Sequence, residues 1–357
     1  MKVRISTRRR FSEAKNILIR GTNWIGDAVM TLPAVSAVRK TFPDARISVL
    51  VKPWVAEIFH LLREVDEVIL YQSPGIHSGT HGILKLAREL KAMKFDTSIL
   101  LQNAIEAAII TWLAGIPIRA GYNSDGRGLL LTHSVQRTKG ILQVHQTGYY
   151  MEMVKSLGCQ SVNTDVRLEP GDDYTALTKT LFETHGLGRN RIRVGIAPGA
   201  TYGPAKRWFP ERFATVADRL IEELSAQMIL FGSSEDRESA DRVQQHSHYP
   251  LINIAGKTNL KEAISAIAQC NLFISNDSGL MHIAGALNIP TVAIFGSTNP
   301  VTTSPVGEKS VVIYKHASCS PCLKETCPTD FRCMDMISVD DVYETAKNLL
   351  YSYKGID

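Results

Sequence analysis

Short apolar segments of strand length recur along the first half of the chain, and longer segments with helical periodicity separate them. The strand-like segments are 16–20, 47–51, 67–71 and 97–101, and the helix-like segments are 27–40, 82–93 and 103–114. Strands that alternate with helices are typical of parallel sheets, because each parallel strand needs a crossover connection. The pattern therefore predicts a doubly wound α/β domain.

The second half repeats this alternation. Its strand-like segments are 194–197, 227–231, 251–254, 271–275 and 291–296, and its helix-like segments are 174–186, 236–246, 260–268, 283–287 and one that begins at Pro210. The best candidate linker is 169–173, Glu-Pro-Gly-Asp-Asp, which is rich in turn-forming residues. We therefore expect two doubly wound α/β domains, 16–170 and 171–338, with a cleft between them in which a ligand binds.

Three segments fall outside this alternation. Segment 121–148 is rich in Gly, Arg, His and Tyr, and we expect an irregular loop until a helix starts near 145; long loops often carry binding residues. A closing helix in 339–357 packs either on the second domain or back on the first. Residues 1–15 are a basic extension whose Arg8–Arg10 run is either a solvated tail or a weak contact for anionic lipid.

The composition limits the classes of protein that fit. With 357 residues, 44% of them hydrophobic and 21% charged, the chain resembles a soluble two-domain protein. Its net charge of +5 does not indicate nucleic-acid binding, but it fits anionic small molecules or an anionic membrane surface. The sequence contains neither an apolar run of membrane-spanning length nor the apolar core of a signal peptide. We therefore expect a cytoplasmic protein.

The stretch Asn276–His282 (Asn-Asp-Ser-Gly-Leu-Met-His) follows a strand-like segment and opens a short apolar helix. Asp277 or Ser278 occupies the position of the helix N-cap. The first backbone N–H groups of a helix have no partner within it, so they can bind a phosphate, and Gly279 permits its close approach. Ser278 and His282 share one helix face. The stretch is therefore either an anion site or a capped helix with a buried histidine.

Two further loops follow strand-like segments in the same half. Loop 198–208 carries the hydroxyl of Thr201 and the cations Lys206 and Arg207, which can neutralise a diphosphate. The next loop carries Ser233 and two carboxylates, and a polar group beyond such a strand often contacts a ribose hydroxyl. Taken singly, the first loop also fits a surface turn with solvated cations, and the second fits a capped helix start.

Asp27 lies in the first half, where the loop after the first strand meets a helix. A carboxylate there can act as a general base towards a bound hydroxyl. The helix N-terminus would keep this carboxylate ionised at neutral pH. The alternative is that Asp27 only caps the helix.

Together these positions indicate nucleotide-sugar chemistry. Three strand ends in the second half each offer groups for part of a nucleotide, whereas Asp27 offers a base from the first half. The second half would then bind the donor and the first half the acceptor. Two alternatives stay open: a sugar-nucleotide epimerase, which would need further carboxylates, and a nucleotide-sugar binding or scaffold protein. Donor turnover with and without acceptor separates the three.

Four of the six cysteines lie close together in the sequence, at Cys319, Cys322, Cys327 and Cys333. Four thiolates can ligate zinc tetrahedrally. The spacing is irregular for a zinc knuckle, which favours reduced thiols in a Cys-rich loop, and we assign no metal ligand.

Three motifs together resemble glycosyltransferase family 9. They are Trp24–Asp27, the run Pro198–Ala200 with Gly203–Trp208, and Asn276–His282. The resemblance extends from about Asn16 to the end of the chain, and the motifs around Lys206 and Asp277 are similar to those of members that add the second heptose of the lipopolysaccharide core. It implies a GT-B fold, with two Rossmann-like domains facing a central cleft, and an inverting transfer without a metal or other cofactor.

The resemblance also implies substrates and residue roles. The donor would be ADP-L-glycero-β-D-manno-heptose, and the acceptor would be the first heptose of heptosyl-Kdo-lipid A at the cytoplasmic face of the inner membrane. Transfer to the first or third heptose position is the alternative. Asp27 matches the family's base, and Lys206 matches the lysine that binds donor phosphate. The donor-binding positions are matched by Thr201, Asp277, Ser278, Gly279 and His282.

Overall fold

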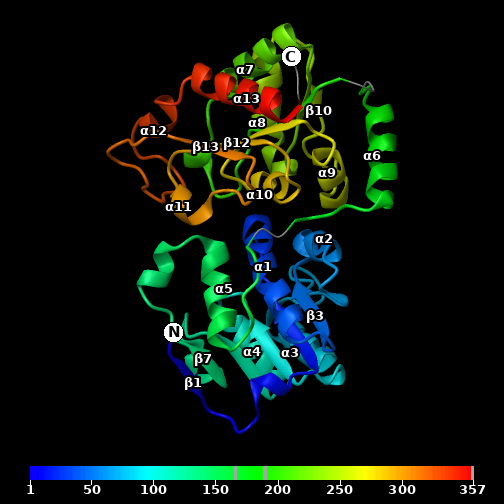
Figure 1. Ribbon diagram of the computed structural model, residues 1–357, viewed down its shortest axis with the longest axis vertical. Helices are drawn as coiled ribbons and strands as arrows, with labels where there is room; N and C mark the ends of the chain where they lie inside the picture. The colour runs from blue at the N-terminus through cyan, green and yellow to red at the C-terminus, as the bar shows by residue number, and fades with distance from the viewer. Residues whose placement is uncertain (165–166, 188–190, 355–357) are drawn as a thin grey trace. The chain divides into compact units, whose positions relative to one another are not determined.

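The computed structural model describes residues 1–164, 167–187 and 191–354. The chain forms two compact units, Met1–Val166 and Arg167–Asp357, each built around its own sheet (Figure 1). This division comes four residues before the expected boundary between 170 and 171. The prediction of two α/β domains is confirmed.

The first unit contains a seven-stranded sheet in the part of the chain that the structure describes. Its strands are β1 Val3–Ile5, β2 Asn16–Arg20, β3 Arg46–Val51, β4 Glu67–Leu70, β5 Thr97–Leu100, β6 Ile118–Tyr122 and β7 His133–Val135. Its α-helices are α1 Ile25–Thr41, α2 Ala56–His60, α3 Gly79–Ala92, α4 Ile105–Leu113 and α5 Gln146–Ser156. The strand order is β1-β7-β6-β5-β2-β3-β4, and β1 alone is antiparallel to its neighbour. Without β1, this is the order of the dinucleotide-binding fold.

Segment 121–148 is more regular than expected. The end of β6 and all of β7 lie in it, and both strands are largely buried. We had predicted an irregular loop because β7 has only three residues and β6 contains Arg119 and Gly121, so neither has a clear apolar period. The burial of these strands comes from their place in the sheet, which a local pattern does not report.

The N-terminal extension is also part of the fold. Val3 pairs with Val135 and Ile5 with His133, so β1 adds an antiparallel strand beside β7. Phe11 is buried, in edge-to-face contact with Phe42. β1 and Phe11 are therefore part of the first unit, and the Arg8–Arg10 run, for which solvation was one of the two expectations, is exposed.

The second unit contains a six-stranded, wholly parallel sheet among its described residues. Its strands are β8 Arg193–Ala197, β9 Gln227–Leu230, β10 Ile252–Asn253, β11 Leu272–Asn276, β12 Thr291–Phe295 and β13 Ser310–Tyr314. Its α-helices are α6 Asp172–Thr184, α7 Pro210–Leu224, α8 Arg237–His246, α9 Leu260–Ile267, α10 Gly279–Ala286, α11 Pro300–Thr303, α12 Arg332–Asp335 and α13 Val339–Lys354. The strand order β10-β9-β8-β11-β12-β13 again matches the dinucleotide-binding fold.

The closing helix α13 belongs to the second unit. It contacts α7 and the strands β11, β12 and β13, and it appears in red beside α7 in Figure 1. Its apolar face buries Val342, Tyr343, Ala346 and Leu350 in the core of that unit. Of the two expected positions for this helix, packing on the second domain is the one observed.

No helix among the described residues is both long enough and apolar enough to cross a bilayer.

Candidate functional site

The strand order of the second sheet reverses between β8 and β11, which are neighbours in space. The chain leaves β8 towards one edge of the sheet and leaves β11 towards the other, so a crevice opens at the carboxyl ends of these two strands. The loop 198–209 follows β8, and Asp277 follows β11. The fold therefore brings together two of the three motifs that the sequence singled out in this half.

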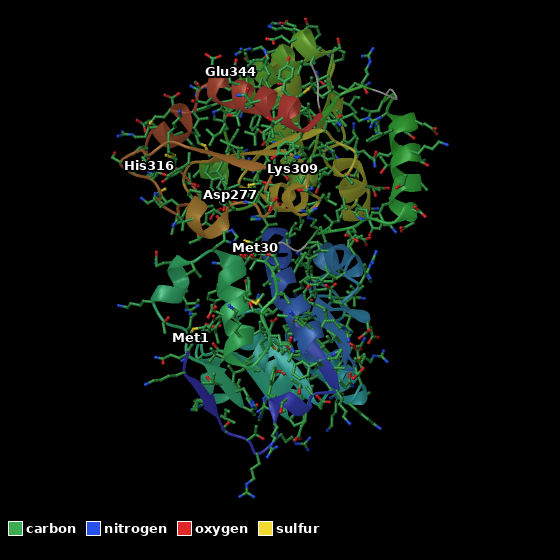
Figure 2. All side chains as sticks on the ribbon, in the orientation of Figure 1. Met1, Met30, Asp277, Lys309, His316 and Glu344 are labelled. Atoms are coloured by element: carbon green, nitrogen blue, oxygen red, sulfur yellow. The ribbon has the colours of Figure 1, made fainter. Side chains whose placement is uncertain are left out.

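Lys206 and Asp277 meet at this point. Lys206 Nζ lies 2.6 Å from Asp277 Oδ2, although 71 residues separate them in the sequence. The hydroxyl of Thr298, which follows β12, donates to the same carboxylate oxygen at 2.7 Å. The Asp277 side chain is only 5% exposed and that of Lys206 is 15% exposed; Asp277 is labelled in Figure 2. Asp277 therefore holds the ammonium group at the edge of the sheet.

Asn276, the last residue of β11, fixes both ends of the loop that carries Lys206. Its Oδ1 accepts the backbone N–H of Trp208 at 3.0 Å, and its Nδ2 donates to the carbonyl of Pro198 at 2.8 Å. Asn276 is fully buried, so these bonds compete little with water. We had not assigned a role to this side chain; the signal was its place at the carboxyl end of a buried strand.

The start of α10 has the geometry expected for a capped helix. Ser278 is the N-cap residue, and its Oγ accepts the backbone N–H of Met281 at 3.4 Å and lies 2.9 Å from Ser275 Oγ. The N–H groups of Gly279 and Leu280 belong to the first turn, where a helix has no internal acceptors. Capping and anion binding are compatible here, because the cap uses the serine oxygen and leaves these amides as donors.

His282 lies one turn into α10 and is 3% exposed. The predicted face shared with Ser278 is present, but the imidazole is inside the unit. Its assignment as a donor contact stays a prediction.

In the loop after β9, Ser233 bonds to a neighbouring carboxylate, and its role as a donor contact stays a prediction. The Ser233 hydroxyl donates to Asp236 Oδ2 at 2.8 Å, and the Ser233 backbone N–H donates to the same oxygen at 3.0 Å. A Cβ at Gly199 would come within 2.0 Å of Asp236 Oδ1, so this carboxylate is wedged between the β8 and β9 loops. Ser233 and Glu235 are both exposed.

The segment 323–325 bonds to the loop that carries Lys206. The backbone N–H of Ala205 donates to the carbonyl of Glu325 at 3.0 Å, and the Tyr202 hydroxyl donates to the carbonyl of Leu323 at 2.8 Å. Gly203 has φ +152°, and a Cβ there would lie 2.4 Å from Glu325, so only glycine fits this contact. Thr201, in the same loop, is exposed. The segment between Cys322 and Cys327, which contains Leu323 and Glu325, therefore supports the loop that carries Lys206.

The four cysteines within 319–333 give no metal centre. Among the described residues, which include all four thiols, no group of three or more Cys, His, Asp or Glu side chains is arranged to hold a metal ion. Burial acts to raise the pKa of Cys327, but hydrogen bonds from Thr329 and from the Phe331 backbone N–H outweigh it and lower that pKa. In this structure the four thiols are free cysteines.

In the first unit, Asp27 lies in the first turn of α1. The N-cap position belongs to Trp24, which makes no side-chain cap hydrogen bond. The negative charge of Asp27 reaches Tyr150 on α5: burial, followed by the charge of Asp27, raises the pKa of that phenol well above its usual value. The structure therefore places an acidic side chain near the positive end of a helix, as predicted.

The carboxyl edge of the first sheet holds two buried guanidinium groups. Arg20 donates to Asn23 Oδ1 at 2.8 Å and to the carbonyl groups of Gly21 and Leu50. Arg127 donates to the carbonyl groups of Tyr122, Gln102 and Leu100. Burial lowers the pKa of each guanidinium to about 10. These residues, which the sequence did not single out, attach the loops around the sheet edge to one another.

Comparison with known proteins agrees with these motifs. The family model described as glycosyltransferase family 9 (heptosyltransferase) matches residues 83–331. Lipooligosaccharide heptosyltransferase 2 of Haemophilus influenzae is 32% identical over 84% of this chain and 88% of its own length.

Two solved structures are similar over almost the whole chain. The Escherichia coli ADP-heptose LPS heptosyltransferase II matches with a TM-score of 0.80 and 28% identity, covering 95% of this chain and 99% of that one. A family 9 glycosyl transferase from Veillonella parvula matches with a TM-score of 0.85 and 26% identity, covering 97% and 99%. The GT-B fold expected from the motifs is confirmed, and the chain belongs to glycosyltransferase family 9, the heptosyltransferases.

Proposed function

We propose that this glycosyltransferase moves L-glycero-D-manno-heptose from ADP-heptose to the first heptose of heptosyl-Kdo-lipid A. The observation that carries the proposal is the Lys206–Asp277 pair beside the first turn of α10, at the point where the strand order reverses. That edge is where such folds bind nucleotides. The names of the relatives, which describe the second heptose transfer, support the choice of acceptor.

In the second unit, the donor diphosphate binds Lys206 and the amides of Gly279 and Leu280. An ammonium group has three N–H donors, so its contact with Asp277 leaves donors for phosphate. Asp277 acts by orienting Lys206. These groups stabilise the negative charge that develops on the departing ADP.

The ribose contact falls to Glu235 in place of Ser233. In dinucleotide-binding folds, an acidic residue after the second strand hydrogen-bonds the ribose hydroxyls, and β9 is the second strand of this sheet. Ser233 and Glu235 are both exposed, but the Ser233 hydroxyl donates to Asp236, and only Glu235 offers a carboxylate at the surface. Thr201 and His282 complete the proposed donor contacts.

Asp27 is the proposed base. It takes the proton from the acceptor hydroxyl while that oxygen attacks the anomeric carbon from the face opposite ADP, which inverts the configuration. The first turn of α1 stabilises the carboxylate form that this step requires. Because the acceptor is a lipid, the reaction takes place at the cytoplasmic face of the inner membrane, with peripheral contact between protein and lipid.

Mass spectrometry of the acceptor after incubation with ADP-heptose tests this function. We expect a mass increase of one heptose on heptosyl-Kdo-lipid A, and no increase on Kdo-lipid A that lacks heptose. Addition to Kdo-lipid A instead would assign the first transfer, and addition only to an acceptor with two heptoses would assign the third. Epimerised donor without any acceptor product would support the epimerase alternative and refute the proposal.

A further inference from the structure

The net positive charge of this protein is concentrated in its first fifteen residues. They hold six of the 40 Lys and Arg residues and one of the 35 Asp and Glu residues. The remaining 342 residues therefore carry 34 of each, and their formal charge is zero. Such an asymmetry indicates electrostatic attraction to an anionic surface.

The structure holds this charge in a defined place. Lys2, just before β1, and Arg4, within β1, line a hollow of about 550 Å³ together with Leu129, and Arg4 Nη2 donates to the carbonyl of Gly128 at 2.6 Å. Ile5, one position along the strand, lines a second hollow with the Arg8–Arg10 run. Val3 lines both hollows, so the basic groups lie together along the edge strand β1.

The Arg8–Arg10 run is anchored at its end and open to solvent. Phe11, the next residue, is buried against Phe42 and limits the movement of the run. Arg10 approaches Glu13 only at 4.0 Å, and 78% of the Arg10 side chain and 68% of the Glu13 side chain remain exposed. Met1 is labelled at this edge of the first unit in Figure 2. The three guanidinium groups are therefore available to an external partner.

Apolar side chains accompany these cations. Ile5 is 60% exposed and Leu129 is 86% exposed. Side chains of this kind can enter the boundary between lipid headgroups and acyl chains. A single-stranded nucleic acid would instead require exposed aromatic rings for base stacking, and the sole aromatic residue of the extension, Phe11, is buried.

We propose that Lys2, Arg4 and Arg8–Arg10, with Ile5 and Leu129, form a basic docking surface for an anionic phospholipid bilayer. This surface specifies where the membrane contact of the proposed function is made. The docking surface depends on the proposed function only for its biological purpose, because it includes none of the proposed donor-binding residues and does not include the proposed base. Each Lys or Arg near an anionic bilayer strengthens binding about fivefold, so the Arg8–Arg10 run supplies about 100-fold.

Vesicle co-sedimentation of the full chain tests the surface without donor or acceptor. We expect binding to vesicles that contain phosphatidylglycerol, little binding to pure phosphatidylcholine, and loss of binding as salt rises. The triple variant R8A/R9A/R10A should bind about 100-fold more weakly, and R9A alone about fivefold. The matched control K85A/R88A/K91A removes three exposed cations from α3 of the same unit and should change binding less than about twofold.

The outcomes separate this surface from the catalytic proposal. Transfer to a detergent-dispersed acceptor should be unchanged in R8A/R9A/R10A, and thermal melting should confirm that the variant is folded. Equal losses in the triple variant and the α3 control would overturn the proposal, as would equal binding to neutral vesicles. Tighter binding to an RNA oligonucleotide than to anionic vesicles would overturn it in favour of nucleic acid. Transfer activity could fail in all variants without affecting the vesicle result.

Discussion

Apart from β1, the two sheets have the same strand order. The cations at their carboxyl edges have different contacts. In the first unit, Arg20 and Arg127 are about 1% exposed or less, and their N–H groups donate mainly to backbone carbonyl groups. In the second unit, Lys206 donates to one carboxylate, that of Asp277, and its side chain is 15% exposed. The first pair of cations connects loops of the protein, whereas Lys206 is presented at the sheet edge.

This difference shows that position in the fold does not decide the role of a cation. Both edges lie where the strand order reverses, and that topology favours a ligand site in each. A buried guanidinium whose N–H groups donate mainly to backbone carbonyl groups contributes to stability. An ammonium group held by a single carboxylate keeps donors for a phosphate. If this difference holds, loss of a first-unit cation lowers stability, whereas loss of Lys206 weakens ligand binding.

Asp27→Asn should have the largest effect, because it removes the base and leaves both cation sets intact. We expect transfer to fall about 10²–10⁴-fold while ADP binding is unchanged, as measured by product formation and calorimetric titration. Asp44→Asn, which changes an exposed carboxylate of the same unit, serves as the control. A transfer rate for Asp27→Asn within a few-fold of wild type would exclude Asp27 as the base.

Arg127→Met should reduce stability more than any cation change in the second unit. It leaves the carbonyl groups of Tyr122 and Leu100 without this donor, and we expect a loss of about 2–4 kcal/mol in the free energy of unfolding. Urea unfolding measures it, with Lys91→Met as the exposed control. If Arg127→Met is as stable as wild type, Arg127 does not have the stabilising role that distinguishes it from Lys206.

Lys206→Met should act on ligand binding. We expect about 10–100-fold weaker ADP binding, since hydrogen bonds to charged groups contribute about 1.5–3 kcal/mol. The loss should shrink as salt rises, because screening weakens a charge interaction. Titration of ADP at two salt concentrations checks this, with Arg242→Met on the exposed face of α8 as the control. Unchanged ADP affinity would remove Lys206 from the donor site.

His282→Ala should weaken ADP binding about fivefold, as expected for the loss of one directional hydrogen bond. This effect should depend less on salt than that of Lys206→Met. A melting curve is needed beside the titration, because His282 is buried. If the melting temperature falls and the folded fraction binds ADP as well as wild type does, His282 is a packing residue.

Chelation should have the smallest effect. In the proposed mechanism, Lys206 and the first turn of α10 supply the positive charge that the departing diphosphate needs, so EDTA should change the transfer rate less than about twofold. Activity that is lost and then restored by Mg²⁺ or Mn²⁺ would contradict this mechanism. Unfolding that only Zn²⁺ reverses would show that the four cysteines bind a structural metal after all.

The success of the sequence prediction depended on how clear the apolar run of each strand is. β8, β9, β11 and β12 were placed within one residue of their observed bounds, because central parallel strands are buried on both faces and form continuous apolar runs. We missed β6 and β7, whose local patterns are weak. We also missed β13, although its segment 311–314, Val-Val-Ile-Tyr, is apolar enough to have been recognised.

The two α/β halves, the capped start of α10 and the polar groups of the Lys206 and Asp277 loops could be predicted from local periodicity and residue type. Which of these groups contact one another depends on the folded arrangement of the strands. In the folded protein, Lys206 pairs with Asp277, and Asn276 bonds to both ends of the loop 198–208. Ser233 bonds to Asp236. The physical reason is that these contacts join the carboxyl ends of strands adjacent in the sheet, and strand order is set by packing of the whole unit.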